Sequence, residues 1–138
     1  MKLTLTAAAI ALALGTSVQA ADTKQINEQH KADVAKCKDL KGNAKDVCKK
    51  EADGKQKVAK AEAELKEHDT AKNRQKVQEA KADAQYAVAK ERCDDQKGDA
   101  KDACKKAAKA ERDGAIAQAK KASLDSEDKT KAPRTKKE

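Results

Sequence analysis

The chain carries a cysteine-bearing motif twice, at an offset of 56 residues, and this duplication constrains the fold more than any other feature. Residues 37–50 read CKDLKGNAKDVCKK and residues 93–106 read CDDQKGDAKDACKK, with ten identities in fourteen positions. Repetition at a fixed offset indicates that one supersecondary unit has been copied. We therefore expect two similar structural units in tandem.

Each copy of the motif reads as a helix, a stop and a second helix. A glycine that can adopt the left-handed conformation ending a helix is followed by an Asn or Asp suited to cap the next helix. An Asp three residues after that cap suits a short capping box and the positive end of the helix dipole. These turn and cap residues are Gly42, Asn43 and Asp46 in the first copy, and Gly98, Asp99 and Asp102 in the second.

The pattern predicts helices over about 23–41, 44–67, 71–97 and 100–122. Two readings of the segment between the second and third helices stay open. Residues 68–70 form a weak break with Thr70 as a cap, or the chain continues through them as one long helix.

Composition favours an all-α protein with a thin core. Charged residues make up 41% of the chain, and Phe and Trp are absent. Ala, Lys, Glu and Gln, which are strong helix formers, dominate the sequence after residue 20, and β-branched or aromatic residues never cluster as in strands. Eleven large apolar or aromatic side chains follow residue 20, too few for a thick core.

The sparse apolar positions predict narrow helical seams. Two segments share a 4, 3, 4 spacing at the repeat offset, and a third has a loose heptad-like stripe. These positions are Ile26, His30, Asp33 and Cys37; Ala82, Tyr86, Ala89 and Cys93; and Val47, Gly54, Val58, Ala61 and Leu65. Such seams suit two antiparallel hairpins that stack on each other or on a second molecule, so self-association is an expectation.

The cysteines lie at matching distances from the predicted turns. Cys37 precedes Gly42 by five residues and Cys48 follows it by six, which places both roughly 8–9 Å from the turn at 1.5 Å per residue. The second copy repeats this arrangement. Four cysteines allow three pairings, and turn geometry with repeat symmetry favours Cys37–Cys48 and Cys93–Cys104.

The first 20 residues have the layout of a secretory signal peptide. Lys2 precedes an apolar run from Leu3 to Leu14, and Val18-Gln19-Ala20 resembles a small-residue cleavage site. A run of about a dozen residues is too short to span a bilayer. We expect cleavage after Ala20, a periplasmic mature chain in an oxidising compartment, and no transmembrane segment.

The remaining domain boundaries follow from the repeat. Residues 21–68 form the first hairpin and residues 69–122 the second. Residues 123–138 have no periodicity and mixed charge, which predicts a disordered C-terminal tail.

The charge of the chain favours weak and unspecific contacts. Its formal net charge is +8, and Lys2 is the one charged residue of the predicted signal peptide, so the mature chain carries +7. Because the two signs are interleaved, most charges are expected to pair on solvated helix faces. Weak attraction to anionic surfaces is expected. Specific nucleic-acid recognition is not, since Tyr86 is the one aromatic residue available for stacking.

Catalytic and metal sites are not expected. The cysteines lack the spacing typical of zinc ligands and form no C-x-x-C motif. His30 and His68 have no neighbours that suggest a triad or an acid–base pair, so we interpret both as solvated surface residues. No Gly-rich phosphate-binding loop is present. The sequence predicts neither an enzyme nor a bound cofactor.

The repeated cysteine motif resembles that of a family of short secreted proteobacterial proteins rich in Ala and Lys. The second copy fits the pattern C-D-x-x-x-G-[ND]-A-K-D-x-C in full and follows Tyr-Ala-Val-Ala-Lys, whereas the first copy has Lys38 in place of the Asp after the cysteine. Labels given to that family refer to cell-envelope biogenesis or to TolA, although the likeness to TolA is limited to an Ala/Lys/Glu-rich helical composition. The resemblance implies an envelope role and no catalytic residue.

These observations predict a non-catalytic periplasmic protein with a structural or stress-related interaction role, whose partners include envelope proteins. The alternative is a chaperone-like binder of unfolded or anionic clients. The alternative is weakened because the sequence shows no large exposed apolar patch that would hold such clients.

Overall fold

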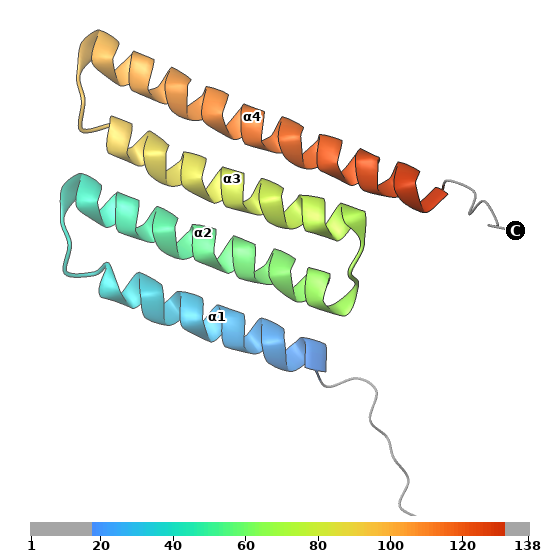
Figure 1. The fold of residues 1–138 in the computed structure, drawn as a ribbon. Helices are drawn as coiled ribbons and strands as arrows, with labels where there is room; N and C mark the ends of the chain where they lie inside the picture. Colours follow the sequence, from blue (N-terminus) through green and yellow to red (C-terminus); the bar gives the residue numbers. More distant parts are fainter. Residues whose placement is uncertain (1–17, 132–138) are drawn as a thin grey trace, which may run out of the picture.

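The computed structural model describes residues 18–131, which form four α-helices joined by short turns (Figure 1). The helices are α1 (Val18–Lys36), α2 (Gly42–Glu67), α3 (Ala71–Cys93) and α4 (Gly98–Lys131). No residue of this range is in a β-strand. The all-α class and the two antiparallel hairpins, α1–α2 and α3–α4, are therefore confirmed.

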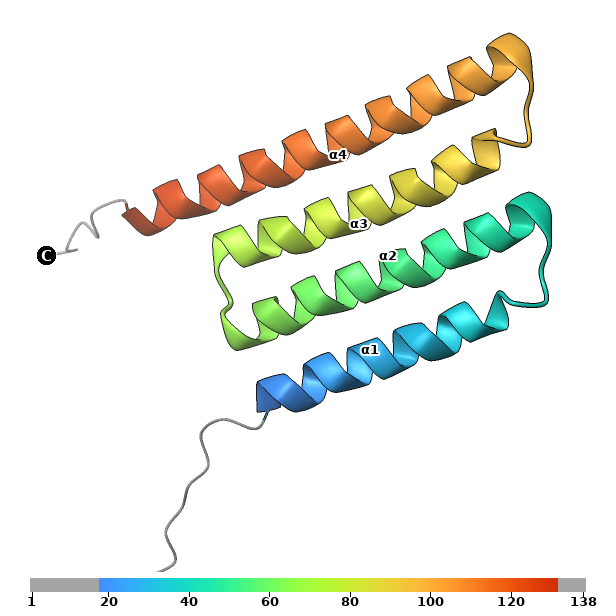
Figure 2. The same ribbon diagram turned by 180° about the vertical axis from the view of Figure 1, so that it is seen from behind.

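The four helices lie side by side in chain order as a single layer (Figures 1 and 2). Within residues 18–131, α1 contacts only α2, α2 contacts α1 and α3, and α4 contacts only α3. A layer of helices normally packs a second layer against its apolar stripe. In this layer, α1 and α4 form the two edges, and no other helix of residues 18–131 covers either face.

The helices before both cysteine turns end earlier than the sequence predicts. We expected them to reach residues 41 and 97, but α1 ends at Lys36 and α3 at Cys93. Tightened i to i−3 hydrogen bonds follow, such as Cys37 N to Val34 O at 3.1 Å and Gln96 N to Cys93 O at 3.1 Å. Helix axes lie about 8–10 Å apart, so the tightened turns help to bring each first cysteine within reach of the next helix.

The two turn glycines adopt the expected left-handed conformation but begin the following helices. Gly42 has φ +56° and Gly98 has φ +55°, and each is the first residue of α2 or α4. Their conformation is the one that glycine adopts without a Cβ penalty. Glycine is therefore needed in both turns, but six residues after the end of α1 and five residues after the end of α3.

A turn over residues 68–70 separates α2 from α3, which settles the alternative that the sequence left open. Thr70 Oγ1 accepts a hydrogen bond from Asn73 N at 3.1 Å and caps α3. The Asn73 amide Nδ2 donates to His68 O at 2.8 Å. The turn thus satisfies backbone groups at both helix ends, which a helix end requires.

Replacing the Thr70 cap is expected to destabilise the protein moderately. Thr70→Ala removes the acceptor for Asn73 N and should lower the free energy of unfolding by about 1 kcal/mol. Thr70→Ser keeps a hydroxyl and should retain most of the stability. Denaturant unfolding followed by circular dichroism measures the difference, and equal stability of the Ala and Ser variants would contradict the capping role.

The core is as thin as the composition predicts. Among the described residues, the buried apolar side chains are Cys37, Ala52, Val77, Ala82, Cys93, Ala108 and Ala119. Every position of the predicted seams is buried or half-buried, and none is exposed. Alanine and the disulfides, more than large apolar side chains, therefore fill the space between the helices.

The C-terminal helix is longer than predicted. We expected it to end at residue 122, but α4 continues to Lys131, with Ser123 only 7% exposed and Ser126 Oγ donating to Ala122 O at 2.7 Å. The predicted tail is therefore wrong for residues 123–131. Its remainder, 132–138, lies outside the described residues.

The predicted signal peptide also falls largely outside the described residues, which begin at Val18, so the expected cut after Ala20 lies within the first turn of α1. None of the described helices combines the length and apolar character that a membrane-spanning segment needs.

Candidate interaction surface

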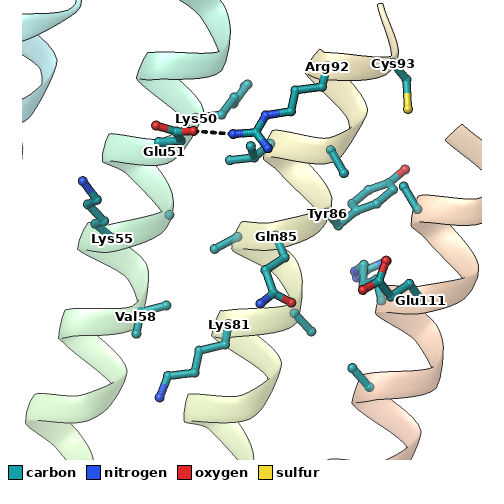
Figure 3. A pocket seen from close by; sticks show the side chains of 18 of the residues that line it. Lys50, Glu51, Lys55, Val58, Lys81, Gln85, Tyr86, Arg92, Cys93 and Glu111 are labelled. Carbon is teal, nitrogen blue, oxygen red and sulfur yellow. Dashed lines mark hydrogen bonds and ion pairs between the residues drawn. The ribbon is translucent and has the colours of Figure 1, made fainter. Parts of the chain in front are cut away.

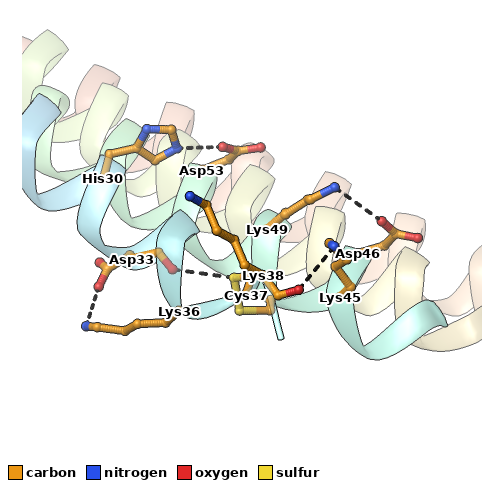
Figure 4. Close-up of a disulfide and its surroundings, with 10 residues drawn as sticks. His30, Asp33, Lys36, Cys37, Lys38, Lys45, Asp46, Lys49 and Asp53 are labelled. Atoms are coloured by element: carbon orange, nitrogen blue, oxygen red, sulfur yellow. Dashed lines mark hydrogen bonds and ion pairs between the residues drawn. A yellow bond between two sulfur atoms is a disulfide. The ribbon is translucent and has the colours of Figure 1, made fainter. Parts of the chain in front are cut away.

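The α1–α2 and α3–α4 turns lie at the same end of the layer (Figure 1), and a disulfide bridges each of them. Figure 4 shows the surroundings of Cys37. Cys37 is bonded to Cys48 and Cys93 to Cys104, each with a Cα–Cα distance of 5.7 Å. Cys37 and Cys93 are each 1% exposed. The predicted pairing is confirmed, and the described residues hold no free cysteine.

The predicted cap residue Asn43 has a different role. The N-cap position of α2 is Lys41, which makes no side-chain cap hydrogen bond. Asn43 Nδ2 instead donates to Glu91 O at 2.8 Å, across to the C-terminal part of α3. Asn43 therefore joins the two hairpins, and the prediction that it caps α2 was wrong.

The other predicted cap residues lie in the first turns of α2 and α4. Asp46 is 3.9 Å from Lys49 Nζ (Figure 4). Asp99 is in the first turn of α4, where a negative charge is favourable. The pKa of Lys101 is raised mainly by its hydrogen bond to Asp94, and the charge of Asp102 adds to this effect.

The second turn contains an ion cluster that the first turn lacks. Asp94 Oδ1 lies 2.8 Å from Lys101 Nζ and 2.6 Å from Lys105 Nζ. Hydrogen bonds from these two lysines lower the pKa of Asp94 to about 2. In the first copy the equivalent position is Lys38, whose backbone oxygen accepts from Lys45 Nζ at 3.3 Å.

Because its pKa is lowered on folding, Asp94 is expected to stabilise the protein above pH 4 and to lose that effect as pH falls toward 2. Asp94→Asn should therefore be less stable than the natural protein at pH 5, and the gap should close near pH 2. Thermal unfolding of both proteins across this range measures it. Asp95→Asn serves as a matched control because Asp95 makes no ion pair within residues 18–131. A gap that persists at pH 2 would contradict the assignment.

His30 is less solvated than predicted. Its side chain is half-buried, and Nε2 lies 2.7 Å from Asp53 Oδ1 on α2 (Figure 4). The pair links α1 to α2 and has no third titratable partner. Within the described residues, no group of three His, Cys, Asp or Glu side chains is placed to hold a metal ion.

A shallow groove of about 850 Å³ crosses α2, α3 and α4 on one face of the layer (Figure 3). Small and apolar side chains form its floor, among them Gly54, Val58, Ala82, Ala89, Ala107 and Ala108. Sequence reasoning missed this surface because each helix supplies only a few small residues to it. The groove exists only once the three helices lie in one layer.

Ion pairs join neighbouring helices along this face. Arg92 Nη2 donates to Glu51 Oε1 at 2.9 Å (Figure 3). Lys81 Nζ lies 3.1 Å from Glu62 Oε1. Both pairs join α2 to α3 along the groove. These two pairs neutralise four of the charged side chains that line the groove. Lys50, Lys55, Glu111 and Arg112 also line it.

The α3–α4 side of the groove is held by Arg112. Its Nε donates to Asp83 Oδ1 at 2.6 Å, and its guanidinium carbon lies 5.4 Å from the centre of the Tyr86 ring. These contacts raise the pKa of Arg112, mainly through the hydrogen bond to Asp83. Tyr86 is thereby held between α3 and α4, where it also lines the groove.

Comparison with known proteins returned no match to a protein-family model, to a curated protein or to a solved structure. The function is therefore inferred from the arrangement of the helical layer, its disulfides and its groove.

Proposed function

We propose that the protein is a non-catalytic interaction protein of the bacterial periplasm, associated with the cell envelope and acting through the exposed surface of its helical layer. The observation that carries this proposal is the open layer itself. Among the four described helices, each packs only against its neighbours in the chain, so no described helix covers either broad face of the layer.

Two further features support this proposal. Disulfides persist in oxidising compartments such as the periplasm, and the two bridges fix both hairpins without a large core. Ion pairs such as Arg92–Glu51, Lys81–Glu62 and Arg112–Asp83 join neighbouring helices beside the groove, whose floor is formed by small and apolar residues. A rigid surface of this kind suits binding.

The proposal is tested by site-specific photo-crosslinking in living cells. A photoreactive residue replaces either Gln85, which lines the groove, or Lys90, about 140° around α3 from it. Both side chains are exposed. We expect an envelope protein to be captured from at least one position, and a periplasmic location of the captured complex. Capture of no other protein from either position would overturn the proposal.

The groove also favours a second candidate function, which is the binding of unfolded clients in the manner of a chaperone. Its apolar floor is larger than the sequence predicts and could contact extended apolar segments. An aggregation-suppression assay separates the two functions. Suppression by the natural protein that is lost in a variant with Ala89→Lys on the groove floor would favour the chaperone function.

A further inference from the structure

We propose that the grooved face of the layer pairs with the same face of a second copy, so that two single layers form one symmetric two-layer dimer. This inference goes beyond the proposed function because it assigns one face to self-association. The opposite faces of both copies then remain available to envelope partners.

The first argument is the uncovered apolar floor. Helices in stable domains bury their apolar side against another layer, and within residues 18–131 nothing covers the groove. The floor consists largely of alanine and glycine, which allow helix backbones to approach closely. A second helical layer therefore fits this face better than an isolated bulky ligand.

The second argument is that two opposite charges, Lys55 and Glu111, lie at the same height along the helix axes. Gly54 of α2 lies against Ala84 of α3, and Arg112 of α4 contacts Asp83 of α3. Residues 54 and 112 therefore lie at the same height. Their neighbours Lys55 and Glu111 do so as well, on the two opposite sides of the groove (Figure 3).

These two charges are available for a partner. Lys55 and Glu111 are both exposed, and neither makes a hydrogen bond or a short ion pair within the part of the chain that the structure describes. Lys55 is near enough to Asp33 to help lower the pKa of that carboxyl, but the closest partners of Asp33 are Lys36 and Gln29.

A two-fold axis parallel to α3 makes this face complementary to itself. Such a rotation keeps every height along the helices and exchanges the α2 side with the α4 side. Lys55 of one copy then faces Glu111 of the other, and the contact occurs twice, as a closed two-fold interface requires. The ion pairs between α2 and α3 remain within each copy.

The available area is sufficient for a specific dimer. The 23 residues of α3 span about 34 Å at 1.5 Å per residue. Three neighbouring helices at 8–10 Å spacing are about 27 Å wide, which gives roughly 900 Å² per copy. A standard interface buries about 800 Å² per partner.

Charge reversal tests this proposal with purified full-length mature protein. The mass in solution is measured by light scattering and sedimentation across a range of micromolar concentrations. We expect a dimer for the natural protein, and at least a tenfold weaker dimer for Lys55→Glu and for Glu111→Lys, because each places like charges opposite one another. The double variant and an equimolar mixture of the two single variants should both recover the dimer.

Lys60→Glu is the matched control, since Lys60 is an exposed lysine of α2 that lies outside the groove. Circular dichroism checks that every variant keeps its helices. A monomer at all concentrations for the natural protein, or a mixture that remains monomeric although both single variants fold, would overturn the proposal. If the protein is a monomer but is still crosslinked to an envelope protein in cells, the dimer proposal fails and the proposed function stands. If it is a dimer that is crosslinked only to a second copy of itself, the proposed function fails and the dimer proposal stands.

Discussion

Removal of one disulfide by Cys93→Ala and Cys104→Ala is expected to lower the free energy of unfolding by slightly under 3 kcal/mol. The bridge closes a loop of 11 residues in sequence separation, and the chain-entropy relation gives about 2.8 kcal/mol for a loop of this length. The seven buried apolar side chains of the described region provide little other stabilisation. Denaturant unfolding of oxidised natural protein and variant measures the loss.

The equivalent change at the other bridge is expected to act more locally. Because α1 packs against α2 alone, loss of Cys37–Cys48 should release α1 while α2 to α4 stay folded. Hydrogen exchange should then accelerate in residues 22–36 and much less in α3. Uniform acceleration throughout the chain, or a stability equal to that of the natural protein for both variants, would contradict this account of the bridges.

Gly54→Ala and Gly114→Ala are expected to change stability in opposite directions, although both glycines are inside helices. A Cβ at Gly54 would lie 2.7 Å from Ala84 Cβ, whereas a Cβ at Gly114 would meet no atom within 4 Å. The alanine at 114 should stabilise by about 0.5–1 kcal/mol through helix propensity.

At position 54 the same gain in propensity is outweighed by the clash, because both Cβ atoms are fixed to helix backbones. Overpacking of this kind costs about 1–3 kcal/mol, and α2 and α3 must separate to accommodate it. Parallel thermal unfolding of the two variants measures the contrast. Equal stabilisation by both substitutions would show that α2 and α3 do not approach as closely as described.

The sequence predicted the features that are encoded locally or by the repeat. The duplicated spacing around Gly42 and Gly98 identified two hairpins and the correct cysteine pairing, because hairpin geometry places residues equidistant from a turn at the same height. Thr70 was one of two alternatives for residues 68–70, because a helix-start signal lies within a few residues, and the structure shows that it caps α3.

The features that were missed depend on distant parts of the chain. Asn43 contacts Glu91, 48 residues away, and no local pattern indicates which hairpin end will lie beside it. The groove, and the position of Lys55 and Glu111 at the same height on either side of it, can be recognised only when it is known that α2, α3 and α4 lie side by side in one layer. The extension of α4 to Lys131 was missed because a mixture of Ser, Asp, Glu and Lys fits both a solvated helix and a disordered tail.

One measurement tests most directly whether the protein consists of two disulfide-linked helical hairpins and is exported to an oxidising compartment. Protein isolated from the periplasm under conditions that block thiols is digested without reduction and analysed by mass spectrometry. The structure and the predicted export signal together predict an N-terminus at Ala21 and the linkages Cys37–Cys48 and Cys93–Cys104. Free thiols, or a bond between Cys37 and Cys93, would contradict it.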